Sequence, residues 1–181
     1  ADALVLCPGG FGTLDEAWEV LTLIQTGKSP LVPVVLLDVE GGTYWDKCLE
    51  FMQEELSDKG YILPEDLGLM RLVRTPEEAG EEIAQFYANY HSTRWYGNKF
   101  VIRLNHKLSD AALDHLNQEY ADLCTNGGFK QVKYCEKTHH EPEFCKLQRL
   151  EFSFNARDFG RLRLMVDYIN LSENWAIEQQ Q

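Results

Sequence analysis

Short apolar runs alternate with amphipathic segments at the start of the chain. Residues 3–7 and 34–37 are continuous apolar runs, each bordered by a proline, which is typical of strands buried on both faces of a parallel sheet. Between them, apolar residues recur at steps of three and four over residues 14–26, which predicts an amphipathic helix that ends near Gly27. A strand, a helix and a second strand are therefore expected in this order.

The same alternation continues to about residue 90. Apolar spacing over residues 44–56 predicts a second helix, and residues 70–74 have the pattern of a third strand. Residues 75–78 combine a threonine N-cap, a proline and a capping glutamate, so a further helix is predicted over residues 76–90. Alternating strands and helices indicate a doubly wound α/β fold with a parallel sheet.

Three predicted strands are too few for an open sheet of this kind. The run at residues 3–7 would have one unpaired side, which exposes backbone donors and acceptors. The chain also begins at Ala1 rather than at a methionine. We therefore expect residues 1–92 to be the C-terminal half of a doubly wound, Rossmann-like parallel sheet, which upstream sequence or another subunit completes.

The pattern changes after this first part. Residues 91–98 are polar and aromatic, as in a linker, and residues 93–170 contain further strand and helix signals. The predicted elements are strands at 100–104, 131–135 and 150–154 and helices at 109–124 and 159–169, the first of them capped by Ser109. We expect a small α+β module of βαββα order. Residues 171–181 show no periodicity and are predicted to be a flexible tail.

Charge, apolar runs and cysteine content limit the kind of partner and the location that we expect for this protein. The 181 residues carry 17 basic and 29 acidic side chains, a formal net charge of -12, which argues against a nucleic-acid partner. No run of about 18 apolar residues could span a bilayer and no leader precedes the first strand, so a soluble protein is expected. Five cysteines at unrelated spacings, mostly in apolar stretches, favour buried reduced thiols and a cytoplasmic location.

The candidate chemistry lies where the first strand meets the first helix. The sequence Pro8-Gly9-Gly10-Phe11-Gly12-Thr13-Leu14-Asp15-Glu16 joins them through a glycine-rich turn. Such a turn directs backbone N–H groups and the positive end of the helix dipole to one point, which suits a phosphate. The spacing is neither GxGxxG nor a P-loop, and no lysine follows the glycines, so a nucleoside monophosphate fits better than a triphosphate.

Glu16 has two interpretations. Thr13 and Glu16 satisfy the S/T-x-x-E pattern of a capping box, in which Glu16 bonds back to the start of the helix. A carboxylate beside a bound phosphosugar could instead activate water or stabilise the oxocarbenium-like state through which a ribose–base bond breaks. Glu16 is the stronger candidate for this chemistry and Asp15 the weaker one.

The same residues resemble a known family. PGGFGTLDE matches every fixed position of PGGxGTxxE, the signature of the Lonely Guy family of nucleotide phosphoribohydrolases, which are also labelled lysine decarboxylases. The similarity extends over roughly residues 1–90. It implies hydrolysis of a nucleoside 5′-monophosphate, such as a cytokinin riboside monophosphate, to free base and ribose 5-phosphate, with no metal or cofactor. It also implies a homodimer, in which Gly9, Gly10, Gly12 and Thr13 bind phosphate and Glu16 is catalytic.

The chain also departs from this family. The family's first glycine-rich turn, and an arginine that works with the glutamate, lie ahead of the signature and have no counterpart here. We therefore expect the chain to hold half a site and to be inactive alone, whereas a longer parent protein would be the enzyme. The βαββα module is a further departure from the short family members.

Two groups of polar residues could bind a ligand, although simpler interpretations compete. Cys135, Cys145 and the pair His139-His140 fit none of the usual zinc spacings, so no metal is expected. Asp38, at the end of the second strand, could meet a ligand or could satisfy the glycine turn that follows it.

Arginine and aromatic residues of the second part raise a similar choice. Arg157, Arg161 and Arg163 could hold an anion, but neighbouring acidic residues favour a solvated face of ion pairs. Trp95 and Tyr96 could stack on a base, but packing of a linker is the more ordinary explanation.

Two other functions compete with hydrolysis. In one, the glycine-rich turn holds a nucleotide without chemistry and the second part of the chain mediates assembly. In the other, the decarboxylase label would be literal, but the segment shows no lysine in a pyridoxal phosphate context, since Lys28 lies beyond the helix.

Overall fold

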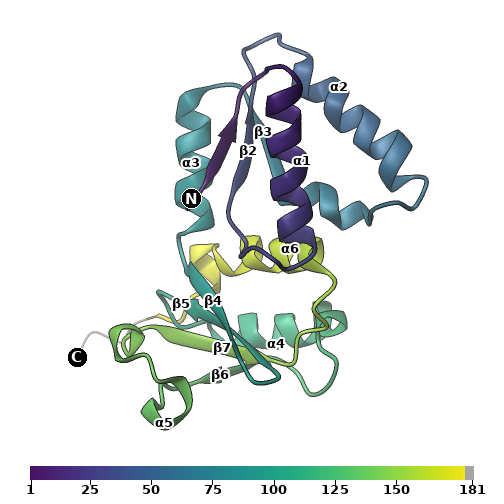
Figure 1. Ribbon diagram of the computed structural model, residues 1–181. Helices are drawn as coiled ribbons and strands as arrows, with labels where there is room; N and C mark the ends of the chain where they lie inside the picture. The colour runs from purple at the N-terminus through teal and green to yellow at the C-terminus, as the bar shows by residue number, and fades with distance from the viewer. Residues whose placement is uncertain (178–181) are drawn as a thin grey trace. The chain divides into compact units, whose positions relative to one another are not determined.

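The computed structural model describes residues 1–177 and is a mixed α/β structure with two sheets (Figure 1). Its residues group into two compact units, one of residues 1–86 and 156–164, the other of residues 87–155 and those from 165 onward. The domain limits predicted at residues 92 and 170 stay predictions. Within residues 1–177, no helix is both long and apolar enough to cross a membrane.

The first unit contains a three-stranded parallel sheet in the order β1-β2-β3. Its elements are β1 (Leu4–Leu6), α1 (Phe11–Gln25), β2 (Val34–Leu37), α2 (Tyr44–Phe51), the π-helix η1 (Met52–Ser57), the 3₁₀ helix η2 (Pro64–Leu69), β3 (Met70–Val73) and α3 (Pro76–Phe86). The three predicted strands and their parallel pairing are confirmed. Val34, Val35 and Leu36 of the central strand are almost fully buried, as its continuous apolar run predicts.

Two helix boundaries differ from the prediction, and one cap agrees with it. The first helix begins at Phe11 rather than at residue 14, and α3 ends at Phe86 rather than at residue 90. The predicted cap of α3 is confirmed, because the Glu78 N–H donates to the Thr75 hydroxyl at 3.1 Å and the Thr75 N–H donates to the Glu78 carboxylate at 3.3 Å.

The second unit is built on an antiparallel sheet in the order β4-β5-β7-β6. Its elements are β4 (Tyr90–Tyr96), β5 (Lys99–Leu104), α4 (Asp110–Glu119), η3 (Ala121–Leu123), β6 (Lys130–Val132), α5 (Glu136–His139), η4 (Pro142–Phe144), β7 (Gln148–Phe152), η5 (Ser172–Asn174) and the end of α6 (Phe159–Ile169). The predicted linker at residues 91–98 is wrong, because most of it is strand β4. With the short helix α5 between β6 and β7, the order of strands and α-helices is therefore ββαβαβα rather than βαββα.

The pairing of β4 explains the error. Trp95 lies opposite Phe100 in the β4–β5 hairpin, and their ring centroids are 4.8 Å apart. Trp95, predicted from the sequence to lie in a linker, is thus a cross-strand partner of Phe100. The prediction that Ser109 caps the next helix is confirmed, since its hydroxyl accepts a hydrogen bond from the Ala112 N–H at 3.1 Å.

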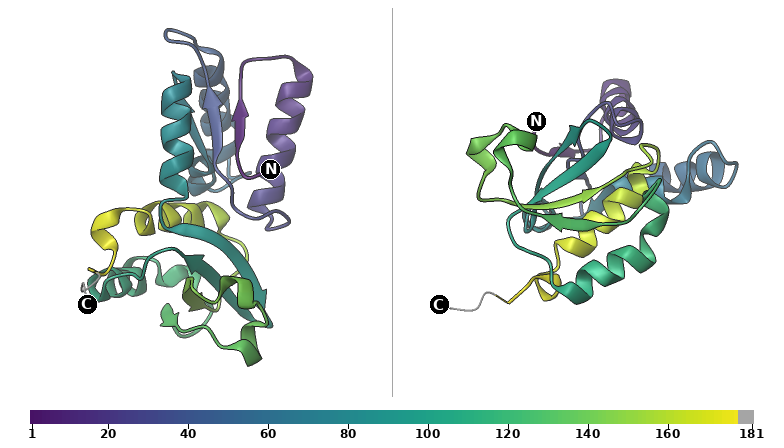
Figure 2. Two further views of the ribbon diagram at one scale, coloured as in Figure 1. Left: turned by 90° about the vertical axis from the view of Figure 1, so that its left-hand side faces the viewer. Right: turned by 90° about the horizontal axis from the view of Figure 1, so that it is seen from below.

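The two faces of the antiparallel sheet differ in character. Phe100, Ile102, Leu150 and Phe152 alternate onto the face that α4 and the end of α6 cover, and all four are buried. Figure 2, right, shows the sheet with these helices on one side and the segment that contains α5 on the other. That segment covers the opposite, polar face of the sheet.

A buried ion cluster lies on this polar face. Arg103 and Arg149 are directly opposite each other on β5 and β7, and both donate to the carboxylate of Glu141, which has no exposed surface. Burial raises the pKa of Glu141, but the hydrogen bonds of Arg103, Tyr96 and Arg149 and the charge of Arg103 outweigh this effect and lower the pKa to about 2. The Glu141 carboxylate is thus ionised throughout the neutral range.

This depressed pKa predicts an acid-sensitive contribution to stability. Relative to an ordinary value of 4.5, a folded-state pKa of about 2 stabilises the folded protein above pH 4.5 by about 3 kcal/mol. The contribution should be lost as the pH falls from 4.5 toward 2. Denaturant unfolding of the wild type and of Glu141→Gln at pH 6 and pH 3 tests this: the gap between the two proteins should narrow in acid. A gap that stays constant would contradict the prediction.

Two further expectations about side chains are wrong. Arg163 is buried rather than solvated, since it pairs with Glu82 at 2.5 Å and lies over the Phe86 ring. All five cysteines are free, but Cys7, Cys135 and Cys145 are exposed rather than packed in the interior. A burial argument from flanking apolar residues therefore fails for these three thiols.

The predicted tail is described only as far as residue 177. Residues 172–174 form η5, and the Trp175 ring stacks on His106 with their centroids 4.2 Å apart. Trp175 also forms an isolated bridge with Leu108. The remaining residues, 178–181, lie outside the described part of the chain.

Candidate functional site

The carboxyl ends of the three parallel strands meet at one edge of the first sheet. The turn at residues 7–10 follows β1, the loop at residues 38–43 follows β2, and Arg74 follows β3. Ligands of open α/β sheets bind outside this edge. The glycine-rich turn singled out from the sequence therefore lies where such a fold places a binding site.

The turn leaves the amino end of α1 open. Gly10 is the N-cap residue and no side chain caps the helix. The N–H groups of Thr13 and Leu14 bond to the Gly10 carbonyl at 3.1 and 3.3 Å, whereas those of Phe11 and Gly12 make no hydrogen bond within residues 1–177. Two backbone donors at the positive end of a 15-residue helix are thus available to an anion.

The three glycines of the turn differ in whether the surrounding structure leaves room for a side chain. A Cβ on Gly9 would overlap the Thr13 hydroxyl, so packing within the turn itself requires a glycine there. A Cβ on Gly10 or Gly12 would meet no atom within 4 Å. The fold does not demand glycine at these two positions, and neither has a left-handed backbone. A ligand that approaches the backbone closely would demand it.

Glu16 lies in the second turn of α1, on the side that also carries Gly12 and Thr13, since residues three and four apart are neighbours on a helix. Its side chain is exposed and has no hydrogen bond or ion pair within residues 1–177. The capping-box interpretation is therefore wrong, because the helix begins two residues before Thr13. Asp15 is also exposed, and it borders an open hollow together with Phe11, Gly12 and Trp18.

Tyr44, which sequence reasoning assigned only to a helix surface, supports the turn. Its hydroxyl donates to the Gly9 carbonyl at 2.8 Å and so joins the start of α2 to the turn after β1. An aromatic hydroxyl shortly after a Gly-Gly pair was the only sequence signal for this contact. Tyr44 is a positioning residue, since it touches the turn rather than the space in front of it.

Removal of the Tyr44 hydroxyl should loosen this turn. Tyr44→Phe loses one hydrogen bond to a backbone carbonyl, so we expect a loss of about 1 kcal/mol in the free energy of unfolding. Tyr61→Phe is a matched control, because Tyr61 is 76% exposed and its hydroxyl makes no hydrogen bond within residues 1–177. Denaturant titration measures both variants, and equal stability for the two would contradict the positioning role of Tyr44.

Asp38 and Arg74 build the neighbouring loop rather than a ligand site. The buried Asp38 carboxylate accepts hydrogen bonds from the N–H groups of Val39 and Tyr44 at 2.8 and 3.0 Å. Arg74 donates to the Gly42 carbonyl at 3.0 Å and to both carboxylate oxygens of Asp46 at 2.8 Å. Of the two interpretations of Asp38, the structure supports its role in the glycine turn.

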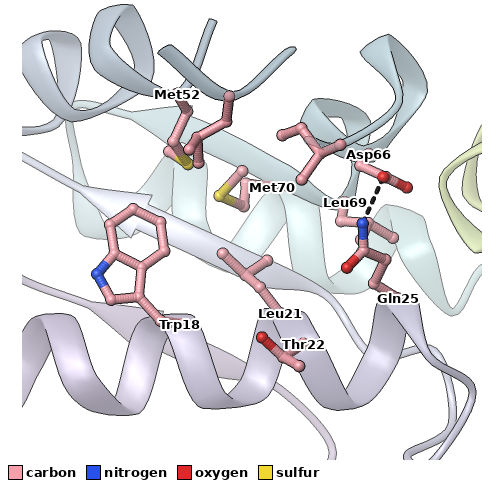
Figure 3. A pocket seen from close by; sticks show the side chains of 10 residues that line it. Trp18, Leu21, Thr22, Gln25, Met52, Asp66, Leu69 and Met70 are labelled. Atoms are coloured by element: carbon pink, nitrogen blue, oxygen red, sulfur yellow. Dashed lines mark hydrogen bonds between the residues drawn. The ribbon is translucent and has the colours of Figure 1, made fainter. Parts of the chain in front are cut away.

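A second hollow in the first unit lies along α1 and shares Trp18 with the first one. A cavity of about 260 Å³ separates α1 from η1 and η2, and Figure 3 shows Trp18, Met52 and Met70 among its apolar walls. At one end, the Gln25 amide donates to the Asp66 carboxylate at 2.6 Å. Trp18 is two residues from Glu16, about 200° away around the helix, so the cavity and Glu16 lie on different sides.

The part of the chain that the structure describes does not gather metal ligands at this edge or elsewhere. Within residues 1–177 there is no group of three or more histidine, cysteine, aspartate or glutamate side chains placed to hold an ion. His139 instead accepts a hydrogen bond at Nδ1 from the Cys135 N–H at 2.8 Å. The glycine-rich turn offers two backbone N–H donors, and the Glu16 carboxylate on the next turn of the helix is an acceptor.

A glycine-rich turn at the carboxyl edge of parallel strands, followed by an exposed glutamate, is an arrangement typical of nucleotide-binding α/β proteins. Comparison with known proteins narrows this class. Residues 1–83 match the family described as "Possible lysine decarboxylase". The resemblance to the Lonely Guy family is thereby confirmed for this part of the chain.

Two curated relatives are named as cytokinin riboside 5′-monophosphate phosphoribohydrolases. The chain is 35% identical over 86 residues to the probable cytokinin riboside 5′-monophosphate phosphoribohydrolase LOGL2 of Oryza sativa subsp. japonica. These 86 residues are 48% of this chain and 34% of the relative. It is 44% identical over 64 residues to the cytokinin riboside 5′-monophosphate phosphoribohydrolase LOG7 of Arabidopsis thaliana. These 64 residues are 35% of this chain and 28% of the relative. The chain thus spans about a third of the length of these relatives.

Proposed function

We propose that this chain contributes the phosphate-binding turn and the catalytic carboxylate of an enzyme that hydrolyses the N-glycosidic bond of nucleoside 5′-monophosphates. The products are free base and ribose 5-phosphate, and cytokinin riboside monophosphates are candidate substrates because the relatives are named for them. The observation that carries the proposal is the uncapped amino end of α1, with Gly10 and Gly12 free of packing constraints.

Each residue of the turn has a distinct part in this proposal. The N–H groups of Phe11 and Gly12 donate to the 5′-phosphate, and Gly9, Gly10, Gly12 and Thr13 shape the backbone around it. A phosphate held there places the ribose near the next turn of the helix. The Glu16 carboxylate stabilises positive charge at C1′ or takes a proton from the attacking water.

The finer description of the fold and of the assembly belongs to the same proposal. The three-stranded sheet is the C-terminal half of a doubly wound, Rossmann-like sheet, and the working site forms near a homodimer interface. Support comes from the match over residues 1–83 and from β1, an edge strand whose Val5 side chain is 44% exposed. A cytoplasmic location stays a prediction.

A direct assay tests the reaction. The full-length protein that carries this segment is incubated with a panel of purine, pyrimidine and cytokinin riboside monophosphates, and base release is followed by chromatography. We expect release from nucleoside monophosphates and none from the corresponding nucleosides, because the turn recognises the phosphate. Equal rates for nucleosides would contradict the assigned phosphate site.

A non-catalytic nucleotide-binding module is the second candidate. It is favoured by the same open helix end, which binds a phosphate whether or not Glu16 acts on the ribose. Calorimetry separates the two functions: tight binding of a nucleoside monophosphate without base release would identify the binding module.

A further inference from the structure

The polar face of the antiparallel sheet carries three arginines around one carboxylate. We propose that Arg94, Arg103 and Arg149 form a binding site for the phosphate group of a small molecule, and that the Glu141 carboxylate occupies the phosphate position in this structure. The site lies in the second unit and does not involve the glycine-rich turn, so it does not rest on the proposed reaction.

The sheet forces two of the arginines together. Arg103 on β5 is directly opposite Arg149 on β7, and like charges in directly opposite positions repel each other. Both side chains are almost fully buried, at 4% and 1% exposure, so water cannot screen them. Arg94 on the neighbouring strand β4 adds a third guanidinium, whose Nη1 lies 3.7 Å from the Glu141 carboxylate. These strands therefore require an anion between the arginines.

A single carboxylate does not balance this charge. Three guanidinium groups and one carboxylate leave two positive charges, in a chain whose net charge is -12. Of the other charged residues on this face, Lys130 is opposite Glu151 and offsets it, whereas Lys99 adds further positive charge. A phosphate monoester carries about −1.5 to −2 at neutral pH, so it balances the cluster better than a carboxylate does.

The number of hydrogen-bond donors leads to the same conclusion. Glu141 accepts from Nε and Nη2 of Arg103 and from Nη2 of Arg149. Arg149 Nε is buried and has no hydrogen-bond partner within residues 1–177. The guanidinium fork matches carboxylate and phosphate oxygens equally well, and a phosphate offers three terminal oxygens instead of two. The site therefore has an unused buried donor, Arg149 Nε, for a larger oxyanion.

Glu141 reaches the arginines from a segment that lies over the sheet. We call residues 133–147 the strap. Two aromatic residues of the strap pack against the arginines, with Arg103 over the Phe144 ring and Arg149 over the Tyr134 ring. His140, just before Glu141, has a left-handed backbone with φ of 51°, which is uncommon for a residue other than glycine. Glu141 is thus a tethered competitor for the site, and an external phosphate would have to displace it.

The test replaces Glu141 by its neutral isostere in the full chain. Glu141→Gln removes the competing charge, and Glu143→Gln, an exposed glutamate of the same strap, is the matched control. We expect inorganic phosphate to bind Glu141→Gln about tenfold more tightly than the wild type in calorimetry, because the intramolecular competitor is lost. Phosphate should also raise the melting temperature of Glu141→Gln, while Glu143→Gln should match the wild type. Any phosphate that binds at the glycine-rich turn does so in all three proteins, so it does not contribute to the differences in affinity between them.

Two additional measurements test whether the tighter phosphate binding involves Arg94 and which phosphate compound the site prefers. Arg94→Gln in the Glu141→Gln background should remove most of the gain, and it is a mild change because the Arg94 side chain is 54% exposed. Ribose 5-phosphate is titrated alongside: equal affinities would indicate free phosphate as the ligand, and tighter binding a sugar phosphate. A folded Glu141→Gln that binds phosphate no better than Glu143→Gln would overturn the proposal and leave Glu141 as a structural ion-pair partner.

The wild type supplies a test that does not depend on the variant folding. If phosphate displaces Glu141, amide hydrogen exchange of the strap should become faster when phosphate is added, whereas exchange of α4 should not change. Unchanged exchange of the strap at saturating phosphate would count against the site, whatever the behaviour of Glu141→Gln.

Discussion

Replacement of Glu16 by glutamine should lower base release from nucleoside monophosphates by about 10²- to 10⁴-fold in the full-length protein, with little change in nucleotide affinity. Glutamine keeps the size of the side chain but can neither take a proton nor balance positive charge at C1′. The Glu16 side chain is exposed and has no partner within residues 1–177, so the fold should not depend on its charge. The effect should therefore appear in kcat.

Two other carboxylates serve as controls for this result. Asp15→Asn tests the adjacent acid, which lies about 100° from Glu16 around α1 and should matter much less. Glu50→Gln removes an exposed carboxylate from α2 and should leave the rate unchanged. Normal turnover by Glu16→Gln would refute its catalytic role, whereas a larger loss for Asp15→Asn would move that role to the neighbouring residue.

Truncation of Glu141 to alanine should destabilise the protein by about 3–5 kcal/mol, because the buried guanidinium groups of Arg103 and Arg149 lose their counter-ion. A loss of this size is a large part of the stability of a typical domain. Denaturant unfolding of the wild type and the variant measures it, at neutral pH where Glu141 is ionised.

A comparison with apolar replacement separates charge from packing. The triple variant Arg103→Met, Glu141→Leu and Arg149→Met removes all three charges, so we expect it to recover most of the stability lost in Glu141→Ala. Glu143→Ala, from the exposed side of the strap, should change stability by no more than about 0.5 kcal/mol. A triple variant as unstable as Glu141→Ala would indicate that shape, rather than charge, holds the cluster.

Much of the first unit is predictable because its signals are local. Residues 34–37 are an apolar run that only a buried strand explains, and Thr75 and Glu78 specify a helix start through their own side chains. The start of α1 was harder to place, since Gly10 caps through its backbone and leaves no side-chain signal. The S/T-x-x-E pattern at Thr13 was then a coincidence of spacing within a helix.

The contacts that were missed join residues far apart in the sequence. Tyr44 is 35 residues from Gly9, and Glu141 is 38 residues from Arg103. Neither pair has a spacing that a pattern could detect. Strand β4 was missed for a related reason, because its polar residues Ser92 and Arg94 contact Arg103 and Glu141 on the sheet. A sheet with a buried polar face does not show the usual apolar alternation.

The exposed thiol of Cys7 gives experimental access to the glycine-rich turn. It lies directly between the end of β1 and Pro8, and no disulfide occupies it. A thiol-reactive fluorophore attached there would sit three residues from Gly10, at the edge where the strands end. With the other two exposed cysteines, Cys135 and Cys145, replaced by serine, the label would become a single optical reporter for nucleotide arrival at the turn.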